Sequence, residues 1–193
     1  MIQVINQQFK TTDMMNVIDT TSRSTNWSRG LSPFYCGPVN LYDGYSAYNV
    51  ENGWQYSKVY YNHADANDNP TADYFKWADA GWRSIKANRY PMGKGSKPLY
   101  SFWDGDKLSY IEARQRVYIP LYSEAVKKTY AFKKLKEIYS EVKSNSKETL
   151  YLKDFDAHNL PDDYDYTYSK LWNNPNIKVG HAYVLAMLLE GTL

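Results

Sequence analysis

The stretch from Asn49 to Tyr61, NVENGWQYSKVYY, gathers side chains that can do chemistry on a sugar. If it is a helix, spacings of three and four residues place Glu51, Gln55 and Lys58 on one face, with Trp54 beside Lys58. A carboxylate can move a proton or stabilise positive charge, an amine can be a nucleophile, and a flat ring can stack on a base. The same spacing also describes an ordinary solvated helix face, so both interpretations stand.

Other blocks of the sequence follow one another in a definite order. They are LSPFY at 31–35, GPVNLYDGYSAY at 37–48, VENGWQYSKVY at 50–60, MGKGSKPLYSFW at 92–103 and VGHAYVLAMLL at 179–189. In this order they resemble the NADAR (YbiA-like) family of N-glycosidases, whose members carry an LSNFY-type segment, a helix of the form vEhayQaaKf, a short MGR segment and an NxLGxLLM element. The resemblance covers most of the chain and indicates a divergent member. Compared with the family, the chain has a long insertion at 159–176, and chains with an insertion of this kind also resemble uncharacterised phage proteins.

The resemblance implies a fold and a reaction. The fold is α+β, with residues 1–193 forming a single helix-rich domain that has a small sheet. The reaction is hydrolysis of a ribose N-glycosidic bond, in ADP-ribosylated guanine or a related ribosylamine nucleotide, and so reversal of ADP-ribosylation. Such cleavage builds positive charge at the anomeric carbon. Glu51 would then move a proton or stabilise that charge, and Lys58 would attack the anomeric carbon or the opened aldehyde.

The resemblance also implies contacts with the substrate. Gln55 would orient ribose hydroxyls, while Trp54 and Phe34 would stack on flat groups. Ser32 and Phe34, with Arg29, would line the edge of the pocket. Pro33 stands where the family usually has asparagine, which removes a hydrogen-bonding side chain.

Two further segments are assigned to the substrate by the resemblance. Gly93 and Lys94 match the family's glycine-arginine segment, where a cation would meet a phosphate. Lysine would do so as a point charge, without the fork of an arginine. Asp154 or Asp156, after an expected strand at 149–153, would supply a second carboxylate.

A second function class is a nucleotide- or ADP-ribose-binding protein that sequesters its ligand without cleaving it, as a phage counter-defence. Pro33 and Lys94, the departures from the family pattern, favour this alternative. A third possibility is action on a partner through a lysine-rich helix. For that helix a solvated face is the default, and contact with nucleic acid is the alternative. Its lysines are Lys127, Lys128, Lys133, Lys134 and Lys136.

Composition sets wider limits. The net charge of +2 is too mild to predict a dedicated duplex-DNA binder, although a nucleotide or a modified base within nucleic acid remains open as substrate. Twenty tyrosines and six tryptophans can form a stacking cage or an ordinary core. The single cysteine, Cys36, is expected to be a packed side chain in a reducing compartment. We therefore expect a cytoplasmic protein, in the host cytoplasm if phage-encoded, with no membrane segment.

We expect no metal and no cofactor. His63, Asp65 and Asp68 lie in one polar loop but lack the spacing of an EF-hand. Asp154, Asp156 and His158 would need a further ligand to hold a metal.

Periodicity and turn residues predict the remaining elements. Ser109 and Glu112 should form a capping box, with Glu112, Arg114 and Arg116 pointing outward, and Pro120 should kink or end that helix. His181 is expected to be a satisfied structural histidine. The other expected elements are strands at 2–9 and 16–20, a loop at 21–30, a hairpin turning at Asp43 and Gly44, helices at 49–61, 70–87, 123–142 and 180–190, and an insertion at 159–176.

Overall fold

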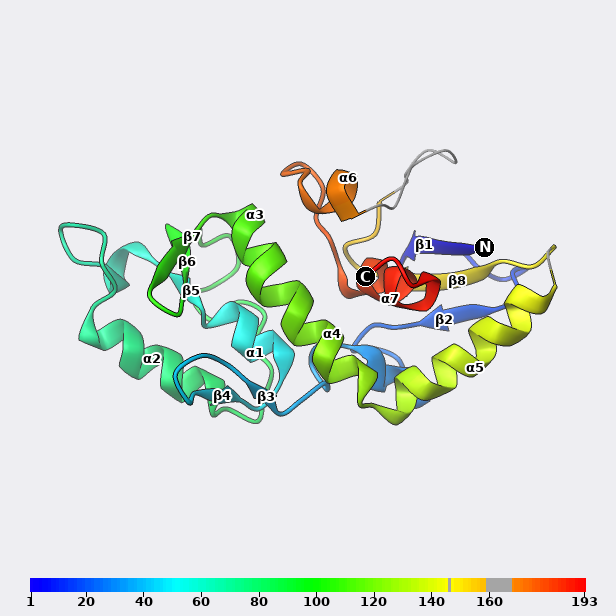
Figure 1. Ribbon diagram of the computed structural model, residues 1–193, viewed down its shortest axis with the longest axis horizontal. Coiled ribbons are helices and arrows are strands. Elements are labelled where there is room, and N and C mark those ends of the chain that lie inside the picture. The colour runs from blue at the N-terminus through cyan, green and yellow to red at the C-terminus, as the bar shows by residue number, and fades with distance from the viewer. Residues whose placement is uncertain (146, 159–167) are drawn as a thin grey trace. The chain divides into compact units, whose positions relative to one another are not determined.

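The computed structural model describes residues 1–145, 147–158 and 168–193. The chain divides into two compact units: unit 1 combines Met1–Ser32 with Val126–Leu193, and unit 2 is Pro33–Ala125. Helices and small sheets occur in both units, so the predicted α+β class is confirmed (Figure 1). The assignment of residues 1–193 to one domain stays a prediction.

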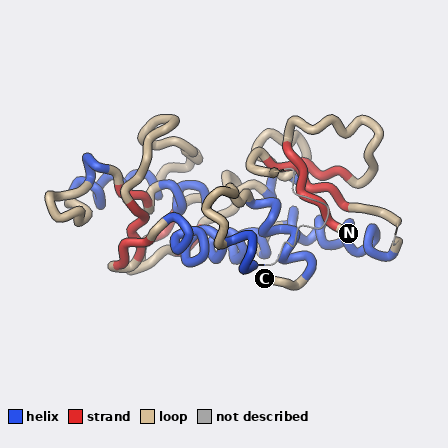
Figure 2. Tube along the Cα trace, turned by 90° about the horizontal axis from the view of Figure 1, so that it is seen from above, coloured by secondary structure: helices blue, strands red, loops and turns tan. Residues whose placement is uncertain are grey.

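Unit 1 is built on a parallel sheet of three strands, which lie side by side in Figure 2. β8 (Leu150–Asp154) is the middle strand, between β1 (Ile2–Asn6) and β2 (Val17–Asp19). Alternate residues of a strand face the same side, and in β8 the buried series is Leu150, Leu152 and Asp154. An acid therefore ends the apolar face of the central strand.

Helices cover this sheet. α7 (His181–Glu190) lies against β1 and β8, and its residues from His181 to Met187 are all buried, as expected of a helix that is apolar on every side (Figure 1). α5 (Tyr130–Ser144) packs on the short η1 (Trp27–Leu31), which also contacts β2. The backbone of α6 (Tyr168–Trp172) completes the described part of unit 1.

Unit 2 contains a short hairpin and a second three-stranded sheet. The hairpin pairs β3 (Val39–Asn40) with β4 (Ser46–Ala47). Its turn has positive φ at both Asp43 and Gly44, which confirms the prediction. The sheet is antiparallel, with β6 (Tyr100–Trp103) between β5 (Lys58–Val59) and β7 (Asp106–Leu108).

The helices of unit 2 differ from one another in regularity. α1 (Val50–Gln55) and α2 (Ala72–Trp82) are α-helices, and η2 (Tyr61–His63) is a single 3-10 turn. α3 (Tyr110–Ala113) begins with the expected capping box. It continues through a π-helical segment, η3 (Arg114–Tyr118), into α4 (Ile119–Lys127), within which the boundary between the units falls.

The helix predicted for 49–61 is shorter than expected. It begins at the predicted cap, Asn49, but ends at Gln55, and Lys58 lies on β5 instead. β5 pairs with β6, where Lys58 is opposite Ser101, and this pairing with a distant segment ends the helix. Gly53, a glycine inside α1, is closely packed: an added Cβ would lie 3.3 Å from side-chain carbons of both Leu41 and Leu121.

The predicted boundaries of several other elements were also wrong. The helix expected at 70–87 runs over 72–82 and is capped by Thr71. The helix expected at 123–142 is divided between α4 and α5, because Thr129 caps a new helix. Strand β1 ends at Asn6, and the loop expected at 21–30 contains η1.

Arg114 was expected to point outward, but it is only 2% exposed. It lies in the π-helical segment that precedes Pro120, with its guanidinium carbon 4.6 Å from the ring centroid of Tyr110. The break anticipated from Pro120 thus occurs on its N-terminal side, where a proline ring crowds the preceding turn. Of the insertion expected at 159–176, residues 159–167 lie outside the described residues.

Candidate functional site

The start of α1 is fixed by its own cap and by the preceding turn. The side chain of Asn49 accepts a hydrogen bond from the backbone N–H of Asn52, at 2.8 Å. The backbone N–H of Glu51 donates to the carbonyl oxygen of Pro33, at 3.1 Å. Half-buried Phe34 follows in the same turn. The segment that contains Pro33 and Phe34 is therefore held against the first turn of α1.

Three polar side chains form a hydrogen-bonded series along one side of α1 and onto β5. Nε2 of Gln55 donates to Oε1 of Glu51 at 3.0 Å, and Nζ of Lys58 donates to Oε1 of Gln55 at 2.7 Å. Glu51 is 6% exposed and Gln55 is 9% exposed. The nitrogen and the oxygen of the Gln55 amide thus join a buried acid to an amine. The sequence predicted that these three side chains lie together.

Aromatic rings adjoin the amine. Nζ of Lys58 lies 4.6 Å from the ring centroid of Trp54, within the range of a cation–π contact. The ring of Trp54 packs in turn against Tyr118 of η3, with centroids 5.4 Å apart. The π-helical segment therefore supplies an aromatic residue that sequence reasoning missed.

The environment of Lys58 changes its acid–base behaviour. Burial lowers the pKa of the Lys58 amine from 10.5 to about 8, the charge of Glu51 opposes this shift, and that of Arg89 adds to it. At pH 7 about one such amine in ten is neutral, compared with about one in three thousand for an ordinary lysine. An amine of this kind can act as a nucleophile near neutral pH.

A buried asparagine, Asn52, holds the segment that precedes Arg89 close to α1. Asn52, which is fully buried, donates to the carbonyl oxygens of Ser84 and Lys86 and accepts from the N–H of Asn88, at 2.9, 3.1 and 2.9 Å. These bonds fix the segment just before Arg89 to α1. Sequence reasoning missed both Asn52 and Arg89, because the contacts join residues more than thirty positions apart.

A model of a family of unknown function, DUF6939, matches residues 2–172. The chain belongs to this family. No curated protein and no solved structure matches it. The description of DUF6939 carries no activity, so the resemblance to NADAR proteins stays a prediction.

In this DUF6939 chain, the acid at the end of the central strand of unit 1, Asp154, is bonded to other groups of the protein. Asp154 is 2% exposed; its Oδ2 accepts from the N–H of Ala182 at 2.9 Å and lies 3.1 Å from Nδ1 of His181. Its Oδ1 accepts from the N–H of Asp156 at 3.0 Å. Nε2 of His181 lies 2.9 Å from Oγ1 of Thr20, so this histidine is satisfied by protein groups, as expected.

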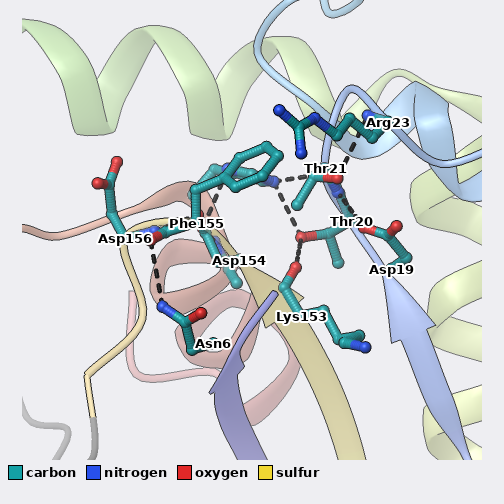
Figure 3. Close-up of polar contacts among 11 residues, drawn as sticks. Asn6, Asp19, Thr20, Thr21, Arg23, Lys153, Asp154, Phe155 and Asp156 are labelled. Carbon is teal, nitrogen blue, oxygen red and sulfur yellow. Dashed lines mark hydrogen bonds and ion pairs between the residues drawn. The ribbon is translucent and has the colours of Figure 1, made fainter. Parts of the chain in front are cut away.

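Thr20, His181 and Asp154 have the residue types of a nucleophilic triad. The hydroxyl of Thr20, however, is inaccessible to a substrate. Thr20 is fully buried, and its hydroxyl also donates to the carbonyl oxygen of Lys153 at 2.8 Å, a bond visible in Figure 3. A nucleophile must meet a substrate. We therefore read this series as a structural connection between β2, β8 and the start of α7.

Asp156 lies in the segment that follows β8 and is half-buried. Beside it, the guanidinium of Arg23 lies 5.0 Å from the ring centroid of Phe155 (Figure 3). The side chain of Asn6 donates to the carbonyl oxygen of Phe155, at 3.4 Å. Asp156 thus lies just beyond the carboxyl end of the central strand of the unit 1 sheet.

The other expected contact residues are dispersed. Ser32 is 2% exposed and ends η1 in unit 1. Gly93 and Lys94 are exposed on successive turns of unit 2, where Gly93 has φ 91°. The described contacts thus bring together Glu51, Gln55, Lys58 and Trp54, and none of them joins Lys94 to this group. The roles given to Ser32, Gly93 and Lys94 stay predictions.

Two further kinds of site were searched for, a metal-ligand cluster and a reactive thiol. Among the described residues, no group of three or more potential ligands could hold a metal ion. Cys36 is fully buried, and burial raises the pKa of its thiol to about 12. A thiol with so high a pKa is a poor nucleophile. None of the helices found in the described part of the chain combines the length and apolarity needed to cross a membrane.

Proposed function

We propose that this chain is an N-glycosyl hydrolase that cleaves a ribose N-glycosidic bond, with ADP-ribosylated guanine or a related nucleotide as substrate. One observation carries the proposal: Lys58 has a pKa lowered to about 8 and is linked through Gln55 to buried Glu51. The resemblance of the sequence to NADAR proteins supplies the substrate class.

The proposed reaction has two steps. In the first step the neutral amine of Lys58 attacks the anomeric carbon, the bond from that carbon to the base breaks, and the electron pair leaves with the base nitrogen. The sugar ring of this adduct then opens: the lysine nitrogen shares its electron pair with the carbon, the bond from the carbon to the ring oxygen breaks, and one proton of the lysine nitrogen passes to that oxygen, which leaves a protonated Schiff base. Glu51 or water delivers the proton that the departing base requires. Water then adds to the sugar carbon and releases Lys58, so that one water is consumed per bond cleaved.

The neighbouring groups have matching roles in this scheme. The face of Trp54 next to the Lys58 amine can stabilise positive charge at the reacting carbon and stack on the base. Gln55 is a positioning residue, because its amide holds both the acid and the amine. Phe34 lies in the turn attached to Glu51 and is proposed to contact the substrate.

Turnover of an oligonucleotide that carries ADP-ribosylated guanine tests the proposal. Lys58→Ala and Glu51→Gln should each lower the rate by at least about 100-fold. Lys86→Ala removes an exposed lysine of the same unit and should leave the rate unchanged. Full turnover by both site variants would show that the assignment is wrong.

A sequestering protein is the second candidate, and the low exposure of Glu51 and Gln55 favours it, since a reacting acid must reach its substrate. Calorimetric titration with ADP-ribose, followed by analysis of the ligand, separates the two functions. Tight binding of the modified base with the glycosidic bond left intact would support sequestration. Release of the free base would support the hydrolase.

A further inference from the structure

Positive charge is concentrated in one segment of unit 1. Residues 127–143 contain six lysines and two glutamates, a net charge of +4, whereas the whole chain carries only +2. Among the described residues, none of these lysines makes an ion pair. The segment therefore carries an excess of positive charge without a direct ion pair to its lysines in the described part of the chain.

A groove of about 630 Å³ lies along this segment. It is formed by the end of α4, one face of α5 and Leu188 of α7. Lys127, Lys133 and Lys136 supply three positive charges to its lining, and Glu137 supplies one negative charge. Lysines concentrated in a groove raise the local concentration of anions and bind them as point charges.

The exposed residues of the groove lining are its three lysines, Glu137 and Ser140, whereas Leu188 is half-buried. Phe132 contributes to the lining but is only 6% exposed, and the hydroxyl of Ser140 is already bonded to the carbonyl oxygen of Lys136 at 2.9 Å. An amphipathic peptide needs an exposed apolar floor for its anchors. The exposed amines of the lining can therefore bind phosphates, and competition by an acidic polypeptide tests the other occupant.

Two aromatic rings belong to α5 or to the element packed on it. Tyr130, the first residue of α5, is 71% exposed. Nζ of Lys134 lies 5.0 Å from the ring centroid of Trp27, which is half-buried in η1. Proteins that bind single-stranded nucleic acid combine a positive groove with rings on which bases stack.

We propose that the groove lined by Lys127, Lys133 and Lys136 binds the phosphate backbone of single-stranded nucleic acid, with Tyr130 stacking on an adjacent base. The site is separate from Lys58, and the inference does not depend on the proposed hydrolase. A duplex presents its phosphates but shields its bases from Tyr130, so it binds more weakly than a single strand of equal length.

Fluorescence anisotropy with an unmodified, labelled DNA strand of about 20 nucleotides tests this site in the full chain. The groove triple variant carries Lys127→Gln, Lys133→Gln and Lys136→Gln. The control triple variant carries Lys10→Gln, Lys86→Gln and Lys97→Gln, which removes the same charge from exposed positions outside the groove. Circular dichroism and thermal unfolding establish that both variants are folded.

The groove variant should bind at least about tenfold more weakly than wild type at low salt. Its plot of log affinity against log salt should be less steep by about 2, because each lost phosphate contact removes about 0.7. The control variant should stay within about twofold of wild type, and Tyr130→Ala should weaken binding of the single strand more than of the duplex.

Three outcomes would overturn the proposal. Wild type could fail to bind the strand, or the two triple variants could weaken binding equally, which would reduce the effect to net charge. Polyglutamate of matched charge could compete as well as DNA, which would assign the groove to an acidic protein partner. Lys58→Ala should bind the unmodified strand as tightly as wild type does. The binding result therefore tests the groove even if the proposed hydrolase activity is not found.

Discussion

Lys58 is the residue on which the chemical account depends, and its chemistry follows from where it lies. A lysine on a solvated helix face would keep an ordinary pKa, but burial lowers the pKa of Lys58 to about 8. Gln55 and Trp54 fix the position of the amine, one by a hydrogen bond and the other by its ring. The interpretation of this stretch as an exposed face is therefore wrong for Glu51 and Gln55, which are buried.

The lowered pKa predicts how stability depends on pH. Below pH 8 both states carry a charged Lys58, and the fold bears the full cost of burying it. Between pH 8 and 10.5 the unfolded chain holds more protons, so raising the pH stabilises the fold. Chemical denaturation should show the wild-type free energy of unfolding rising relative to Lys58→Met, by at most about 1.4 kcal/mol per pH unit.

Other groups titrate in the same range, so the difference between the two proteins is the quantity that matters. Lys86→Met, which alters an exposed lysine, should follow the wild-type curve across the whole range. Parallel curves for wild type and Lys58→Met would show that the pKa of Lys58 is not lowered.

At the scale of elements, local signals in the sequence predicted where helices begin better than where they end. Asn49 and Ser109 cap α1 and α3 as expected, because a cap depends on residues three positions apart. The end of α1 depends on β5 pairing with β6, about forty residues away. No local pattern contains that information.

The same division applies to the candidate site. Glu51, Gln55 and Trp54 lie within five residues of one another, so their spacing could be read from the sequence. Helical spacing correctly predicted that Lys58 lies near Gln55. The reason was incomplete, however, because Lys58 lies on strand β5 and not on a continuing helix. Tyr118 and Arg89 were missed because tertiary packing alone brings them to α1. Asn52 belongs to α1, but its role was missed because its hydrogen-bond partners lie more than thirty residues away.

The start of α7 requires a glycine next to Asp154. A Cβ added at Gly180 would overlap Oδ2 of Asp154 and lie 2.7 Å from its Cγ, whereas the backbone of Gly180, with φ −79°, suits any residue. Gly180→Ala should therefore cost at least about 2 kcal/mol through overpacking alone. In an Asp154→Ala background the same substitution should cost much less.

Thermal or chemical denaturation of the four proteins of this double-mutant cycle measures the coupling, which should exceed about 1 kcal/mol. Asp154→Ala alone should cost about 3 kcal/mol, because it leaves the N–H of Ala182 and the ring of His181 without their acceptor. Additive costs would show that Gly180 and Asp154 do not meet in this way.

At the scale of the whole molecule, each candidate site lies inside one compact unit. Glu51, Gln55, Lys58 and Arg89 all belong to residues 33–125, and the lysine groove belongs to unit 1. A fragment of residues 33–125 should therefore fold cooperatively and keep the low pKa of Lys58. NMR of the reductively methylated fragment, with Lys58→Arg to assign the signal, measures that pKa. A pKa of Lys58 near that of the exposed lysines would show that unit 2 does not form the site alone.

The most direct test of the central claim is to trap Lys58 on its substrate. The chain is mixed with an oligonucleotide carrying ADP-ribosylated guanine, reduced with borohydride during turnover, digested and analysed by mass spectrometry. We expect one sugar-nucleotide adduct, formed by reduction of the Schiff base, on the peptide that contains Lys58, and no adduct in Lys58→Arg. Release of the base with no adduct, and with undiminished turnover by Lys58→Arg, would contradict it.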